Sequence, residues 1–179
     1  MITLLTLFFL TFVAIPNSGN CRCEDPGTVK EAYEYTETII RGKVISKEFV
    51  SYESTMNPEK VIMIKERYKD DKRKMEYLQS EFIIKLDLQT NNTFKGKILS
   101  DTLTLYTTRN GASCGFTRFE FGQEYLIYAS SHSYAYWIFV DNEASETLEL
   151  SNTYWTNQCS RTTEYNKLEE SELLKLKNK

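Results

Sequence analysis

Two cysteines one residue apart, Cys21 and Cys23, have the greatest chemical potential in this chain. They directly follow a segment with the features of a removable secretion signal. Cleavage between Asn20 and Cys21 would give Cys21 a free α-amine beside its own backbone carbonyl. An amine in its neutral form and a carbonyl oxygen, held side by side, can chelate a metal ion. The pair therefore predicts a metal-directed tip at the start of the mature chain.

The signal itself is predicted from residues 4–15, which read LLTLFFLTFVAI. This run carries no charge and is too short to span a bilayer comfortably. A polar, turn-forming stretch follows at residues 16–20, as expected before a cleavage site. We interpret residues 1–20 as a signal peptide and residues 21–179 as one secreted, extracellular domain, with cleavage after Gly19 as the nearest alternative. No second long apolar run follows, so no membrane partner is expected.

Four cysteines belong to the mature chain, and an even number in a secreted protein indicates two disulfides. Cys21 and Cys23 are too close to bridge comfortably to each other. Each is therefore expected to join one of the two distant cysteines, Cys114 and Cys159. Each bridge would close a loop of about 100 residues, which the chain-entropy model values at about 4 kcal/mol.

The pattern of the chain predicts several short strands with a helix near each end. Thr28, followed three residues later by Glu31, has the spacing of a capping box for a helix over residues 29–35. Residues 39–50 alternate like a strand, with Gly42 as a bulge or close approach. Further strands are expected at residues 81–88, 102–107, 124–129, 134–140 and 147–154, and an amphipathic helix at residues 166–177. This arrangement favours a small closed barrel.

Two segments are expected to lie on the surface as loops. Residues 51–75 are rich in charge and predict a long exposed loop or a hairpin extension, since charge runs are usually solvent faces. Residues 91–93, Asn-Asn-Thr, predict a turn between two strands. They also form a sequon, so Asn91 is a candidate for N-glycosylation.

The residue types argue against an enzyme. His132 is the single histidine, so neither a His-Glu-x-x-His zinc site nor a multi-histidine cluster is possible. A Cys–His nucleophile pair needs a free cysteine, and two disulfides would leave none. No phosphate-binding glycine pattern occurs. A net charge of −3 argues against a nucleic-acid partner.

Several motifs together resemble a known family. These are the Cys-x-Cys start, the strand IIRGKV at residues 39–44, ASCGF at 112–116, GQEYLIYA at 122–129, and QCSRT at 158–162 before an acidic, leucine-bearing helix. They resemble the netrin-like (NTR) domain, and within it the N-terminal domain of the tissue inhibitors of metalloproteinases. The likeness spans nearly all of residues 21–179. It implies a mainly β fold, an OB-like five-stranded closed barrel with short flanking helices, and disulfides Cys21–Cys114 and Cys23–Cys159.

The resemblance also implies a function. In that family the N-terminal cysteine sits over the catalytic zinc of a protease, where its amine and carbonyl replace the activated water. Cys21 would chelate the zinc of an extracellular metalloproteinase, and the protein would need no cofactor or metal of its own and would act as a monomer. The residues expected to contact the protease are Arg22, Cys23, Glu24, Ser113, Cys114 and Gly115.

The chain departs from the family pattern at Arg22, where the inhibitors usually carry Thr or Ser, and it lacks the cysteines of a third disulfide. Burying an unpaired guanidinium in an apolar pocket is costly. A second hypothesis is therefore a non-inhibitory NTR module that binds extracellular matrix or a signalling partner, because a fold does not fix a function.

Overall fold

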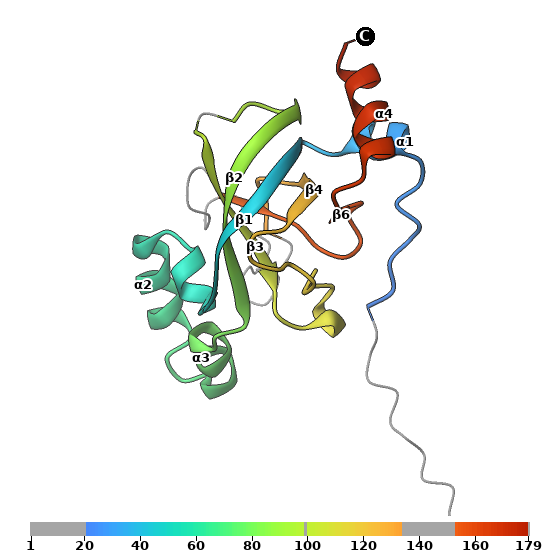
Figure 1. Cartoon of the computed structure of the whole chain (residues 1–179). Coiled ribbons are helices and arrows are strands. Elements are labelled where there is room, and N and C mark those ends of the chain that lie inside the picture. Colours follow the sequence, from blue (N-terminus) through green and yellow to red (C-terminus); the bar gives the residue numbers. More distant parts are fainter. Residues whose placement is uncertain (1–20, 99, 134–152, 179) are drawn as a thin grey trace, which may run out of the picture.

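The computed structural model describes residues 21–98, 100–133 and 153–178 (Figure 1). The predicted signal peptide, the predicted strand over residues 134–140 and most of the one over residues 147–154 lie outside these ranges. The described part is mainly β, with a six-stranded mixed sheet, four α-helices and two disulfides. Among the described residues, no helix has the length and apolar character needed to cross a membrane.

The strands of the sheet are β1 (Thr38–Val50), β2 (Ile83–Lys95), β3 (Thr102–Thr108), β4 (Glu124–Ala129), β5 (Thr153–Trp155) and β6 (Thr163–Glu164). The α-helices are α1 (Val29–Tyr35), α2 (Pro58–Arg67), α3 (Lys72–Gln79) and α4 (Lys167–Lys177). Two short 3-10 turns, η1 (Tyr52–Thr55) and η2 (Gly111–Ser113), precede α2 and follow β3.

The strand order in the sheet is β5-β3-β2-β1-β4-β6. All neighbouring pairs are antiparallel except β3 and β5, which run parallel. One isolated bridge, Ser130 opposite Trp155, links the residue after β4 to the last residue of β5. The described ladders leave the sheet open, with one strand more than the expected five, so they establish a mainly β sheet and not a closed barrel.

Local sequence signals near the N-terminus are confirmed. Thr28 accepts a hydrogen bond from the backbone of Glu31 at 3.2 Å, and the Glu31 carboxylate accepts one from the backbone of Thr28 at 2.7 Å. This capping box begins α1 at Val29, as expected. The ladder register shifts between Arg41 and Gly42, so a bulge lies at the predicted glycine, with its extra residue on the facing strand β2.

The expectation of a long exposed loop over residues 51–75 is wrong, because this stretch forms η1, α2 and the start of α3. Asn57 caps α2 by accepting a hydrogen bond from the Glu59 backbone at 2.9 Å, and Pro58 occupies the first turn. Asp71 caps α3 in the same way at 3.0 Å. The charges occupy the solvent side, while a few apolar residues pack inward.

The predicted turn at residues 91–93 is also wrong, because β2 continues through it to Lys95. Thr90 pairs with Gly42 and Asn92 with Arg41, so Asn91 is the extra residue of the bulge. Asn91 stays exposed, and its side-chain amide donates a hydrogen bond to Glu124. A bulge tolerates the polar residues that we interpreted as a turn.

In the part of the chain that the structure describes, the apolar core falls into three clusters. The largest lies within the curved sheet and includes Ile40, Val44, Leu86, Leu105 and Phe119. A second lies under α2 and α3, and a third lies between the sheet and the helices α1 and α4. Figure 1 shows α1 beside α4 at one end of the sheet, with α2 and α3 at the other.

Candidate functional site

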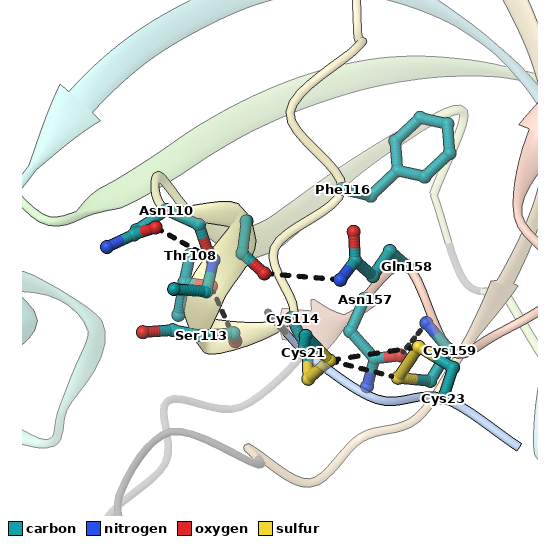
Figure 2. Close-up of a disulfide and its surroundings, with 12 residues drawn as sticks. Cys21, Cys23, Thr108, Asn110, Ser113, Cys114, Phe116, Asn157, Gln158 and Cys159 are labelled. Carbon is teal, nitrogen blue, oxygen red and sulfur yellow. Dashed lines mark hydrogen bonds between the residues drawn. A yellow bond between two sulfur atoms is a disulfide. The ribbon is translucent and has the colours of Figure 1, made fainter. Parts of the chain in front are cut away.

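Three segments far apart in sequence meet at the N-terminal end of the described chain. They are residues 21–24, the loop 110–115 after β3, and residues 157–159 after β5, and we call them together the ridge. Cys21 is bonded to Cys114 and Cys23 to Cys159, with Cα–Cα distances of 5.1 and 4.9 Å. This is the pairing that the resemblance implies. The two bridges touch, because the sulfurs of Cys21 and Cys159 lie 3.5 Å apart (Figure 2).

All four cysteine sulfurs are used in these bonds. The sulfurs of Cys21, Cys23 and Cys159 lie within 4.8 Å of one another, a spacing that free thiols could use for a metal ion. A cysteine sulfur binds a metal ion as a thiolate, and a sulfur in a disulfide is not a thiolate. The ridge therefore offers backbone atoms, and not sulfur, as ligands.

The loop 110–115 is shaped by close backbone contacts. The Thr108 hydroxyl donates a hydrogen bond to the Ser113 carbonyl at 3.0 Å, and the Asn110 side chain caps the turn η2. Cys114 follows with φ of 60°, a left-handed conformation that non-glycine residues seldom adopt. A Cβ on Gly115 would lie 1.8 Å from the Thr108 carbonyl oxygen, so only glycine fits there. The loop thus presents Cys114 in one fixed orientation.

Gln158 ties this loop to the segment after β5. Its backbone amide donates to the Cys114 carbonyl at 2.8 Å, and its side-chain amide donates to the Gly111 carbonyl at 3.1 Å. The side chain of Asn157 accepts a hydrogen bond from the Cys159 backbone at 2.8 Å. Figure 2 shows Gln158 and Asn157 beside the cysteines. These two neighbouring residues therefore hydrogen-bond to one cysteine of each disulfide.

The outer edge of the ridge is open to solvent. Cys21 is half-buried, and Arg22, Cys23 and Glu24 are exposed. Within the described residues, no hydrogen bond occupies the backbone nitrogen or the carbonyl oxygen of Cys21. The sulfur bridge fixes the position of these two atoms, and no described residue hydrogen-bonds to either of them.

A partly buried ion pair holds the chain just behind the ridge. Arg161 donates to the Gly27 carbonyl at 2.6 Å and to the Glu169 carboxylate at 3.0 Å. Tyr128 on β4 donates its hydroxyl proton to the same carboxylate at 2.7 Å. We call these four residues the clamp. It connects the N-terminal segment to α4, because Glu169 lies in the first turn of that helix.

The electrostatics of the clamp keep it charged and closed. Burial of the Tyr128 hydroxyl, and then its hydrogen bond to Glu169, raises the pKa of Tyr128 far above its usual value. Partial burial of the Arg161 guanidinium opposes its charge, but the hydrogen bond and charge of Glu169 outweigh this, so the pKa of Arg161 is raised. Tyr128 therefore stays protonated and Arg161 stays cationic across the physiological pH range.

The histidine of the chain lies apart from the ridge, on the loop after β4. Its Nδ1 atom lies 2.8 Å from the Ser131 hydroxyl and 3.5 Å from the Glu37 carboxylate. A catalytic triad needs the serine and the carboxylate on opposite ring nitrogens, so that one nitrogen takes the serine proton while the carboxylate orients the ring through the other N–H. Here both groups approach the same nitrogen, so Ser131, His132 and Glu37 do not form such a triad.

Neither a scan against models of protein families nor a search of curated proteins finds a match for this chain. The function is therefore inferred from the residues and the geometry of the ridge.

The structure brings most of the expected site residues together. Cys21, Arg22, Cys23 and Glu24 lie beside the loop that carries Ser113 and Cys114. Gly115 belongs to the same loop but is buried, so it supports the ridge from beneath. Asn91 lies on β2, outside the ridge.

Sequence reasoning missed the supporting roles of Thr108, Gln158 and Glu169. Glu169 left one signal, since it precedes Leu173 by four residues and so shares its buried face of α4. Thr108 and Gln158 gave none, because their partners are backbone atoms of segments that meet only in the fold.

Proposed function

We propose that this chain is a secreted inhibitor of zinc metalloendopeptidases, of the kind that resembles the tissue inhibitors of metalloproteinases. Removal of residues 1–20 frees the amine of Cys21, and this amine and the Cys21 carbonyl occupy the catalytic zinc of an extracellular protease. The observation that carries the proposal is the state of Cys21. It is covalently fixed to Cys114 at the edge of the ridge, while its backbone nitrogen and oxygen have no partner in the described residues.

The chemistry follows from the open position of a catalytic zinc. Such a zinc has three protein ligands and one water, which it activates for attack on the peptide bond. An α-amine has an ordinary pKa of about 7.7–8.0, so binding to zinc needs only a modest shift to the neutral form. An amine and a carbonyl oxygen on the zinc leave no site for the water, and hydrolysis stops.

The rigidity of the ridge supports tight binding. A flexible N-terminus would have to lose its conformational freedom on binding, at about 0.5–1.5 kcal/mol for each immobilised side chain. Here the two bridges and the hydrogen bonds of Gln158 order the ridge beforehand. Ser113 and Cys114 would then form the second side of the contact surface, next to Cys21 and Arg22.

The finer description of the fold belongs to the same proposal. We place the chain among NTR domains with an OB-like, five-stranded closed barrel of β1 to β5. The strand order β5-β3-β2-β1-β4 supports it, as does the bridge between Ser130 and Trp155, which joins the two outer members of that set. The short β6 would then lie outside the barrel.

The test compares two forms of the protein against a zinc endopeptidase. One form begins at Cys21, and the other carries a single extra alanine before it. The extra residue turns the amine into an amide nitrogen, which is a poor zinc ligand, so the inhibition constant should rise by at least about 100-fold. Matching thermal unfolding of the two forms is the control for the fold. Equal potency would refute the mechanism.

The second candidate is an NTR interaction module that binds extracellular matrix or a signalling partner. The exposed charge of Arg22, directly beside the proposed zinc ligand, favours it. This candidate predicts no protease complex at micromolar concentration and no effect of the added alanine. Mass spectrometry of the secreted protein separates the two early, since a chain that begins at Asn20 or has a blocked amine supports the module.

A further inference from the structure

Arg22 is an exposed arginine held between two bridged cysteines. Its neighbours Cys21 and Cys23 are each fixed by a disulfide, so the backbone on both sides of Arg22 is ordered. Within the described part of the chain, its guanidinium has neither an ion pair nor a hydrogen bond. The other arginines near the sheet differ, since Arg41 and Arg161 are paired with glutamates.

The remaining arginines around the ridge are also engaged. The guanidinium carbon of Arg109 lies 4.2 Å from the ring centre of Phe49, and that of Arg118 lies 5.1 Å from the ring centre of Phe116. Such stacking holds a cation on the protein's own surface. Arg22 is therefore presented outward on a rigid support, with its charge left for a partner.

The place of Arg22 in a complex follows from the zinc chemistry. In a substrate, the zinc polarises the carbonyl of the bond that is cut, and the next residue enters the pocket on the leaving-group side. A Cys21 carbonyl on the zinc puts Arg22 in that next position. The pocket that ordinarily accepts the substrate residue after the cut then has to accept an arginine.

The charge of Arg22 decides which pocket fits. Burying a guanidinium without a partner is costly, whereas a carboxylate can pair with it through two parallel hydrogen bonds. We propose that the partner is a zinc endopeptidase with a deep pocket that ends in a carboxylate, that is, an enzyme that cleaves before arginine or lysine. This inference rests on the proposed function.

The neighbouring charges narrow the location of that carboxylate. Glu24 is exposed two residues after Arg22, so acidic groups on the rim of the partner would meet like charge. The exposed Asp25 carboxylate accepts a hydrogen bond from the Gly27 backbone at 2.9 Å and adds to this negative charge. The carboxylate of the partner therefore lies inside the pocket, at the reach of an extended arginine.

The experiment measures inhibition constants for three mature proteins, all beginning at Cys21. They are the natural chain, Arg22→Met, which keeps a long unbranched side chain without the charge, and Arg22→Lys, which keeps the charge without the planar fork. Each is tested on a zinc endopeptidase that cleaves before arginine and on one that cleaves before leucine. Arg22 is exposed, so all three should have the same thermal unfolding midpoint.

The expected result is a reversal of preference. On the arginine-directed protease, Arg22→Met should weaken inhibition by about 10–100-fold, the range for losing hydrogen bonds between charged groups. The inhibition constant of Arg22→Lys should lie between those of the natural chain and Arg22→Met. On the leucine-directed protease, Arg22→Met should strengthen inhibition by at least about 10-fold.

The failures are distinguishable. If the natural chain and Arg22→Met have equal inhibition constants on each of the two proteases, the inference is overturned and the proposed function stands. If none of the three proteins inhibits either protease at micromolar concentration, the proposed function fails, and the inference fails with it.

Discussion

The ridge and the helical insertion, residues 52–79, are held to the same sheet by different forces. In the ridge, Arg22, Cys23 and Glu24 are exposed, and two disulfides together with hydrogen bonds to backbone atoms fix the position. The helical insertion has no cysteine. It is held by a cluster in which Tyr52 and Leu78 are fully buried against the sheet.

The difference follows from what each region presents to solvent. A segment that keeps backbone atoms exposed cannot also bury them in a core, so its order has to come from covalent links and capped polar groups. A segment that carries apolar residues can be ordered by burial alone, at about 25 cal/mol for each Å² of apolar surface. The ridge thus keeps its backbone atoms ordered and exposed, whereas the helical insertion covers one end of the sheet.

The largest effect is expected from removal of one bridge. The double change Cys23→Ser and Cys159→Ser should lower the free energy of unfolding by about 4 kcal/mol, because the unfolded chain regains the freedom of a long loop. Urea denaturation measures this loss, and hydrogen exchange of residues 21–28 should rise. A loss below about 1 kcal/mol would show that hydrogen bonds, and not the bridge, hold the ridge.

A core change in the helical insertion should be somewhat smaller and local. Leu78 is fully buried, so Leu78→Ala should cost about 3 kcal/mol through the cavity that it leaves. Ile62 is 69% exposed on α2, and Ile62→Ala is the matched control, with less than about 0.5 kcal/mol expected. Hydrogen exchange should increase in α2 and α3 and stay unchanged in the ridge. Equal loosening of both regions would contradict their separation.

The clamp should give an intermediate effect that reaches the ridge. Arg161→Met leaves the buried carboxylate of Glu169 without its cation, which is strongly destabilising for fully buried pairs. The Arg161 side chain is 27% exposed, so solvent screening reduces the expected loss to about 2 kcal/mol. Faster hydrogen exchange at residues 24–28 is the specific readout. Arg161→Lys should restore part of the protection. Unchanged hydrogen exchange at residues 24–28 in Arg161→Met would show that the clamp does not hold the N-terminal segment.

The smallest effect concerns the cap behind the ridge. Thr28→Ala should cost about 1 kcal/mol, since it removes the side-chain acceptor at the start of α1. Hydrogen bonds from the backbone and then the hydroxyl of Thr28 hold the pKa of Glu31 below its usual 4.5. A lowered carboxylate pKa stabilises the fold above the usual value, and this contribution disappears as the pH falls through the lowered one. The variant should therefore show a weaker loss of stability between neutral and acidic pH, and an unchanged pH profile would contradict the capping role.

The sequence predicted best where local patterns decide the structure. The capping box of Thr28 and Glu31 and the strand from Glu124 to Ala129 were readable, because each depends on residues close together in the chain. The cysteine count indicated two disulfides, because an even number of cysteines in a secreted chain is expected to pair.

The sequence predicted least where tertiary contacts override local pattern. Residues 51–75 looked solvated because their charges outnumber their apolar residues, yet the buried Ile64 and the partly buried Val61 pack α2 against the sheet. The capping signals at Asn57 and Asp71 were present and were outweighed by the charge run. The clamp could not be predicted, since Gly27, Tyr128, Arg161 and Glu169 come from four separate segments.

Binding of the Cys21 amine to the catalytic metal can be followed directly in the spectrum of that metal. A zinc endopeptidase is reconstituted with cobalt, whose visible absorption depends on its ligands, and is titrated with the protein that begins at Cys21. Coordination by the Cys21 amine predicts a change in the cobalt spectrum that saturates at one inhibitor per enzyme, and no such change with the form that carries one extra alanine. Inhibition without any change in the cobalt spectrum would contradict the claim that Cys21 binds the metal.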